Sequence, residues 1–140
     1  MKKIMSFMII ISFVTFAQNT QIDSSLSGSL EGFFTAVQKA DYKNSAEYIV
    51  YSGNDESRKY LEKLNSDNAG ELQSAERIGK KVKAYLDISD SYEFIGSKVV
   101  TENERTFVFV NTAFKSGKQS LNIEFKFVDV QGKYLLVGIE

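Results

Sequence analysis

The sequence feature that constrains the fold most is the unbroken alternation of apolar and polar residues at positions 121–127. In a β-strand, every second side chain points to the same side, so this pattern predicts a strand with one apolar face. The residues of that face are Leu121, Ile123, Phe125 and Phe127. Burying four such side chains contributes roughly 6–12 kcal/mol, at about 1.5–3 kcal/mol each. The rest of the chain must therefore supply a cover for this face.

The hydrophobic period changes from about 3.6 residues to 2 after Asp87 and stays at 2 to the end of the chain. This change predicts four strands, at residues 92–100, 105–115, 119–130 and 134–139. The connections between them are short, and two of them carry a glycine, Gly117 and Gly132, that can adopt positive φ. Consecutive tight hairpins indicate an antiparallel meander.

The residues before Asp87 show helical spacing of their apolar side chains. The pattern predicts a long helix at residues 26–40 capped by Asp23 or Ser24, and a short second helix that carries Ala46, Tyr48 and Ile49. A third helix is predicted at residues 55–64 and a fourth at residues 71–86. Helices first and strands second predict an α+β fold, with the N-terminal helices packed on one face of a curved four-stranded antiparallel sheet.

The N-terminal segment has the composition of a secretory signal peptide. Lys2 and Lys3 precede an apolar run at residues 4–16, and small residues end it at Thr15 and Ala17. We expect residues 1–17 to be a signal peptide cleaved after Ala17, which predicts export to the bacterial periplasm or the extracellular space. The run is too short for a transmembrane helix, although an uncleaved N-terminal anchor is the alternative interpretation. Residues 18–140 then form a single α+β domain with no stable membrane anchor after cleavage.

Composition excludes several classes of function. The chain has no cysteine and no histidine, and its formal net charge at pH 7 is −1. The thiol nucleophile, the commonest general base and the usual zinc ligands are therefore missing, and the sequence implies no cofactor and no metal. A mildly acidic domain also lacks the excess positive charge typical of proteins that bind nucleic acid. The phosphate-loop, dinucleotide-binding and nucleophile-elbow motifs are all absent.

The segment FFTAVQKADY at residues 33–42, followed by AEYI at residues 46–49 and a meander, resembles the nuclear transport factor 2-like (cystatin-like α+β) superfamily. It is similar in particular to the small exported bacterial members of unknown function. The resemblance implies that the curved sheet wraps the long helix into a cone whose cavity opens at one end. Enzymes of that superfamily place acidic, His or Tyr side chains in this cavity, but no residue here matches a catalytic motif of the family.

Three charged groups have both a functional and a structural interpretation. Asp87 and Asp90 could hold a hard cation, but the segment lacks the EF-hand pattern, and a solvated helix end explains it. Asp55 and Glu56 suit the start of a helix, where the helix dipole favours negative charge. The basic cluster at residues 80–83 suits the end of a helix, where the dipole favours cations, so no nucleic-acid partner is expected.

The aromatic residues give the best candidate site. The sequence contains 7 Tyr and 11 Phe, and tyrosines combine an apolar ring with a hydroxyl group, as expected at the mouth of a pocket. Ordinary core packing is the structural alternative for each of them. We expect the helix stripe and the strand face to enclose a ligand-binding cavity lined by Phe34, Tyr48, Tyr85, Phe109 and Phe125.

Three functions fit this sequence. The first is an exported, non-enzymatic protein that binds a small apolar or amphipathic molecule, or a protein partner, in the cavity. The second is a small enzyme that uses an Asp–Tyr pair in the same cavity for proton transfer. The third is an interaction module that forms a homodimer through the open face of its sheet, since the predicted second strand carries bulky residues on both sides. A buried carboxylate in the cavity would favour the enzyme, and an apolar lining would favour binding.

Overall fold

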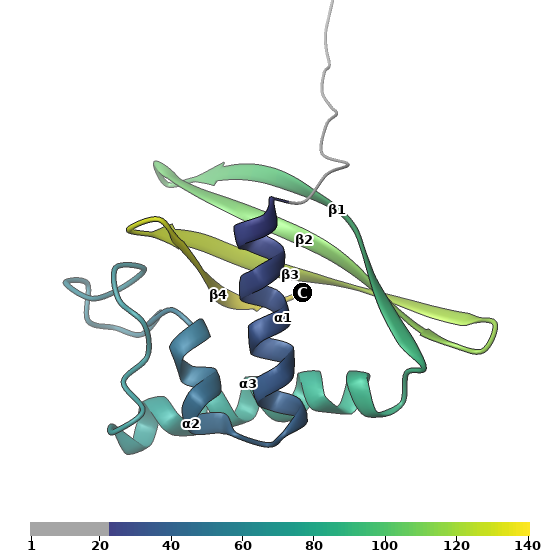
Figure 1. Cartoon of the computed structure of the whole chain (residues 1–140). Coiled ribbons are helices and arrows are strands. Elements are labelled where there is room, and N and C mark those ends of the chain that lie inside the picture. The colour runs from purple at the N-terminus through teal and green to yellow at the C-terminus, as the bar shows by residue number, and fades with distance from the viewer. Residues whose placement is uncertain (1–22) are drawn as a thin grey trace, which may run out of the picture.

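The computed structural model describes residues 23–140, and the predicted signal peptide at residues 1–17 lies outside them. The chain is α+β, with the helices in the N-terminal half and an open four-stranded antiparallel sheet in the C-terminal half. The helices pack against one face of the curved sheet (Figure 1). Among the described residues, no helix is both apolar enough and long enough to cross a lipid bilayer.

The long N-terminal helix, α1, spans Ser24–Gln38 and is capped by Asp23, whose side chain accepts a hydrogen bond from the Ser25 backbone N–H at 2.8 Å. Because its apolar residues recur every three or four positions, they form one stripe that lies buried against the sheet. The buried apolar residues of this stripe are Leu26, Leu30, Phe33, Phe34, Ala36 and Val37. The sequence-based helix and its cap are confirmed here.

Helix α3 spans Ala69–Asp87 and crosses α1 on the same side of the sheet (Figure 1). The Asn68 side chain caps its first turn by accepting a hydrogen bond from the Glu71 backbone N–H at 3.1 Å. The buried residues of α3 follow the predicted spacing: Ala75, Gly79, Val82 and Leu86.

The sheet contains four strands: β1 (Ser91–Glu102), β2 (Arg105–Ser116), β3 (Gln119–Val130) and β4 (Lys133–Ile139). They pair in sequence order, each antiparallel to the next, as the meander prediction required. Ile123, Phe125 and Phe127 are buried on the helix-covered face. Leu121, the first residue of the predicted apolar face, is 45% exposed because the hairpin between β2 and β3 extends past the helices.

The short second helix differs from the prediction. Helix α2 spans Tyr42–Ser45 and begins earlier than expected, because Asp41 is its cap. The Asp41 side chain accepts a hydrogen bond from the Asn44 backbone N–H at 3.1 Å. A single 3₁₀ turn, η2, follows at Ala46–Tyr48, and Ile49 is already extended.

The predicted helix at residues 55–64 is wrong. Residues 51–64 form turns and extended segments that we call the 51–64 flap. The backbone N–H groups of Tyr60 and Leu64 donate to the carbonyls of Tyr51 and Ile49, at 2.9 and 2.8 Å, instead of to residues four positions earlier. Tyr60 also has φ of 62°, which an α-helix cannot accommodate. Few apolar residues supported the helical period there, and tertiary contacts decided the local structure.

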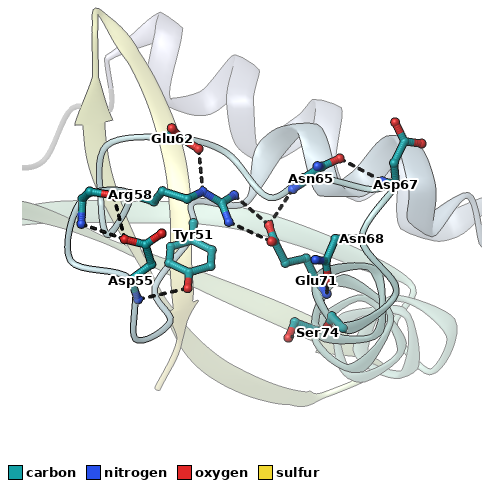
Figure 2. A network of polar contacts seen from close by, with 11 residues as sticks. Tyr51, Asp55, Arg58, Glu62, Asn65, Asp67, Asn68, Glu71 and Ser74 are labelled. Atoms are coloured by element: carbon teal, nitrogen blue, oxygen red, sulfur yellow. Dashed lines mark hydrogen bonds and ion pairs between the residues drawn. The ribbon is translucent and has the colours of Figure 1, made fainter.

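The flap is held to α3 by one ion pair, which we call the clamp. The Arg58 guanidinium donates two hydrogen bonds to the Glu71 carboxylate, at 2.8 and 2.9 Å, and a third to Glu62 at 2.7 Å. Figure 2 shows Arg58 between these carboxylates, with the Tyr51 ring 4.1 Å from the guanidinium carbon. Glu71 accepts a further hydrogen bond from the Asn65 backbone N–H at 2.8 Å. A planar, bidentate contact of this kind fixes orientation as well as distance.

Candidate functional site

The candidate site is a cleft between the C-terminal end of α3 and the hairpin that joins β2 to β3. Its volume is about 520 Å³, which is within the range of about 300–1,000 Å³ that is usual for small-molecule pockets. The cleft is open to solvent on one side. Its lining consists of four residues with large apolar groups, Tyr85, Ile88, Phe114 and Leu121, and four uncharged polar residues, Ser89, Ser116, Gln119 and Ser120. We call it the α3–hairpin cleft.

The apolar wall on the helix side follows from the way α3 ends. Ile88 is the C-cap residue, and its backbone N–H still donates to the Ala84 carbonyl, so its side chain is carried beyond the last buried turn. It is 69% exposed, the largest exposed fraction among the bulky apolar residues of the described chain. Ser89 follows, and its hydroxyl donates to the Tyr85 carbonyl at 2.5 Å, which closes the helix end. Exposed apolar side chains point to a binding surface where they form a contiguous patch, and Ile88 shares the lining of this cleft with Tyr85, Phe114 and Leu121.

The sheet side of the cleft comes from a cross-strand pair. Phe114 on β2 lies directly opposite Leu121 on β3. Phe114 is 3% exposed and forms the floor, with its ring centroid 5.6 Å from that of Tyr85 and 5.9 Å from that of Phe34. The floor of the cleft is therefore continuous with the aromatic core beneath α1.

Asp90 fixes the width of the cleft by joining its two sides. The Asp90 backbone N–H donates to the Lys115 carbonyl at 2.7 Å. The Asp90 carboxylate accepts a hydrogen bond from the Gly117 backbone N–H at 2.8 Å. Gly117 has φ of 59°, which only glycine adopts without strain, so the turn can present this N–H to Asp90. These contacts give Asp90 a structural role at the base of the hairpin.

The structure separates the five residues that the sequence singled out. Tyr85 lines the α3–hairpin cleft. Phe34 and Phe125 are 1% and 0% exposed, with ring centroids 5.5 Å apart in an edge-to-face contact. They fill the space between helix and sheet with aromatic packing and reach the cleft only through the ring of Phe114.

Tyr48 and Phe109 lie elsewhere. Tyr48 packs against α1 where Gly32 leaves room, since a Cβ atom on Gly32 would come within 2.6 Å of the Tyr48 hydroxyl. Phe109 is on the sheet face opposite the helices, which we call the far face, in a second apolar cluster with Phe107 and Val128. Its ring is separated from the other four residues by the sheet itself.

The sequence did not single out Ile88 or Leu121 as site residues. Ile88 stood within the acidic segment at residues 87–90, and Leu121 was assigned to the buried face of its strand. Position was the only available signal, since Ile88 directly follows α3 and Leu121 is the first apolar residue of β3. Within the described residues, no cluster of three or more potential metal-ligating side chains occurs.

The Tyr92 hydroxyl beside the aromatic core has a raised pKa. Burial raises the pKa of the Tyr92 hydroxyl, and the negative charge of Glu31 raises it further. The Tyr92 ring lies 4.9 Å from that of Phe34 and 6.3 Å from that of Phe114. A hydroxyl whose pKa is raised above its ordinary value is fully protonated at neutral pH and is a poor general base.

A second hollow of about 480 Å³ lies beside the clamp and contrasts with the cleft. Its lining is mostly charged or polar and includes Glu47, Arg58, Glu62 and Lys63. These side chains pair with one another, Lys63 with Glu47 and Arg58 with Glu62. The two hollows are nearly equal in size, so lining chemistry rather than volume distinguishes them.

Comparison with known proteins gives no family. No protein-family model matches this chain, and no curated protein matches it in sequence. Any function must therefore be argued from the geometry and chemistry of the cleft.

Proposed function

We propose that this chain is an exported binding protein, without catalytic activity, that holds a small amphipathic molecule in the α3–hairpin cleft. The observation that supports this proposal is the lining of the cleft. Large apolar groups from two elements meet small hydroxyl and amide side chains around a volume of about 520 Å³. Such a combination is typical of sites that bind an apolar body and orient it by a few polar contacts.

The lining also indicates the class of ligand. Ile88, Leu121 and the Tyr85 ring offer an apolar surface to an alkyl chain or a ring system. The polar side chains, Ser116, Gln119 and Ser120, carry no formal charge and match a hydroxyl, amide or carbonyl group better than a strongly charged one. We therefore expect an uncharged or weakly charged amphiphile rather than a phosphate ester.

An enzyme in the same cleft is less well supported. Proton transfer by an Asp–Tyr pair needs a carboxylate within hydrogen-bond reach of the substrate. None of the eight lining residues carries a carboxylate, and the nearby Asp90 carboxylate already holds the Gly117 N–H. Tyr85 is the one lining residue with an ionisable side chain.

The proposal includes export and the resemblance to the nuclear transport factor 2-like superfamily. The charged N-terminus and the apolar run at residues 4–16 support export. If the segment is cleaved as proposed, N-terminal sequencing of the protein recovered outside the cytoplasm reads from Gln18. A chain that retains Met1 or Lys2 in a membrane fraction would support an uncleaved anchor instead.

Two exposed leucines allow a matched test of the binding site. Leu121 in the cleft is 45% exposed, and Leu61 in the flap is 50% exposed. We expect an uncharged hydrophobic dye and a panel of single-chain alcohols, amides and monoglycerides to bind the wild-type protein. Leu121→Asp should weaken binding at least about tenfold, because the charge is desolvated by the ligand. Leu61→Asp should bind like the wild type.

Equal loss in both variants, or no binding by any member of the panel to the wild-type protein, would contradict the proposed site. Circular dichroism and thermal unfolding of both variants serve as the folding control. Because both leucines are substantially exposed, neither substitution removes a core contact.

A further inference from the structure

The two edge strands of the sheet, β4 and β1, differ in whether another part of the described chain pairs with them. The β4 edge is paired at Leu136, where Ile49 forms a parallel bridge and the Val50 backbone N–H donates to the Leu136 carbonyl at 2.9 Å. Across residues 23–140, β1 pairs only with β2. No described residue covers its outer edge, which runs along the top of the sheet in Figure 1. A long open edge is a template for pairing with another chain.

The uncovered edge of β1 carries exposed apolar residues. β1 has 12 residues, and a bulge between Phe94 and Gly96 divides it. Beyond the bulge, Val99 is 68% exposed. Proteins commonly protect such an edge with a charged residue, and Lys98, with 58% of its side chain exposed, occupies that position here. Whether Lys98 blocks pairing depends on the residue opposite it.

The hairpin turn determines which backbone groups face outward. Asn103 and Glu104 both have positive φ, 50° and 65°, so they form a two-residue turn that pairs Glu102 with Arg105. In an antiparallel ladder, alternate residues direct their N–H and C=O groups to the same neighbour. Counting back from Glu102, the groups of Val99 and Thr101 face away from β2. These outward groups must bond in any pairing through this edge.

Charge selects one register among those that the backbone allows. With a two-fold axis at Val100, Lys98 of one copy lies opposite Glu102 of the second copy, and Val99 lies opposite Thr101. The outward groups of Val99 and Thr101 then form a hydrogen-bonded pair. Moving the axis to Lys98 places two lysines opposite each other, and like charges in that position are destabilising. Moving it to Val99 leaves Lys98 opposite Val100, with no ion pair.

We propose that two copies of this chain form a homodimer by antiparallel pairing of their β1 strands, centred on Val100, so that the two sheets become one continuous sheet. The interface is isologous, with each ion pair and each backbone pair present twice. It is distinct from association through a sheet face, because it uses the strand edge and leaves the α3–hairpin cleft open. The pairing is short, so we expect a dissociation constant in the micromolar range or weaker.

Charges on the far face are already arranged for this extension. Within one copy, Lys98 contacts Glu124 at 3.3 Å and Lys126 contacts Glu102 at 3.0 Å, both across the aromatic strand β2. Both contacts are diagonal, because Lys98 shares its cross-strand row with Phe109 and Lys126, and Glu102 shares its row with Arg105. In the proposed dimer, the second copy adds one opposite charge beside each of these ion pairs, since its Glu102 meets Lys98 and its Lys98 meets Glu102.

A charge-swap cycle tests the proposal on the purified protein. Sedimentation velocity from micromolar to millimolar concentration should show a monomer–dimer equilibrium for the wild type. Lys98→Glu and Glu102→Lys should each raise the dissociation constant about tenfold, because each reverses two cross-strand pairs in the dimer. The double variant K98E/E102K should restore much of the wild-type affinity. Lys118→Glu, at the β2–β3 turn, is the control and should dimerise like the wild type.

Amide hydrogen exchange gives a second readout that does not depend on any variant. The Val99 and Thr101 N–H groups should be protected at high protein concentration and exchange freely at low concentration. The Val100 N–H faces β2 and should be protected at both. A monomer at every concentration would overturn the proposal. So would a dimer that neither single charge reversal weakens, which would indicate a different surface.

Discussion

The two ends of α3 present hollows of similar size and opposite chemistry. At the N-terminal end, the clamp between Arg58 and Glu71 leaves the charged groups paired, and the Asn68 cap satisfies the first turn. At the C-terminal end, the cap residue Ile88 is 69% exposed and faces Leu121 across the cleft. Paired charges indicate a structural role, and unpaired apolar surface indicates a binding role. The same helix thus has paired charges at its N-terminal end, which we call the closed end, and unpaired apolar surface at its C-terminal end, which we call the open end.

The largest expected effect on stability comes from removing the ring of Phe114, which forms the floor of the α3–hairpin cleft. Phe114→Ala deletes a ring that contacts Phe34, Tyr85 and Phe125, so we expect a loss of about 3–5 kcal/mol in the free energy of unfolding. Urea denaturation monitored by circular dichroism measures it. A loss below about 1 kcal/mol would show that the cleft floor is not part of the core.

Removing the clamp between Arg58 and Glu71 should have a smaller and more local effect on stability. In Arg58→Ala, Glu71 loses its bidentate partner, and the flap is no longer held to α3. We expect the thermal midpoint to fall by less than in Phe114→Ala, because the sheet and the α1 packing remain intact. Amide exchange should accelerate at Tyr51 and Leu64, whose N–H groups bond within the flap region. Unchanged exchange at these two positions would mean that the clamp does not hold the flap.

The clamp also predicts how the free energy of unfolding depends on pH in the acid range. Hydrogen bonds from Arg58 lower the pKa of the Glu71 carboxyl below its ordinary value of 4.5. A lowered folded-state pKa contributes stability that is present above the unfolded value and is lost as pH falls through the folded value. Wild type should therefore be more stable than Glu71→Gln at pH 7, and the difference should narrow below pH 4.5. A difference that is constant from pH 7 to pH 3 would contradict this role for the Glu71 charge.

Substitution of Ile88, at the rim of the cleft, should have the smallest effect on stability and a clear effect on ligand binding. Ile88 and Val99 are 69% and 68% exposed, so Ile88→Ser and Val99→Ser should each change the free energy of unfolding by no more than about 0.5 kcal/mol. Only Ile88→Ser should weaken binding of the amphiphile panel. The two variants thus separate the exposed apolar residue in the cleft from the one on the sheet edge. Equal binding by both would remove Ile88 from the site.

The sequence predicted the sheet more fully than the site. The four strands follow from a period of two that local residues enforce, and both α1 and α3 follow from long apolar stripes. The 51–64 flap could not be predicted in this way, because its form depends on Arg58 meeting Glu71, a contact between residues that are distant in sequence. The spacing of Tyr60, Leu61 and Leu64 matched a helical period instead.

The candidate site was predicted only in part for a related reason. Sequence patterns indicate that Phe34 and Phe125 face the same core, but whether two rings enclose a cavity or fill it depends on their final separation. Phe109 lies on the far face because successive side chains of β2 alternate between the two faces of the sheet. This alternation places Phe107 and Phe109 in the second apolar cluster, away from the helices. Ile88 and Leu121 face the cleft because a helix and a hairpin end side by side, which is a property of the tertiary structure.

The most direct test of the account is to map where an amphiphile binds. In a ¹⁵N-labelled sample titrated with a short-chain monoglyceride, we predict chemical-shift changes at the amides of residues 85–90 and 114–121. The amides of residues 51–71, around the clamp, should not move. Shifts centred on the clamp, or on the far face around Phe107 and Phe109, would contradict the assignment of the open end of α3 as the binding site.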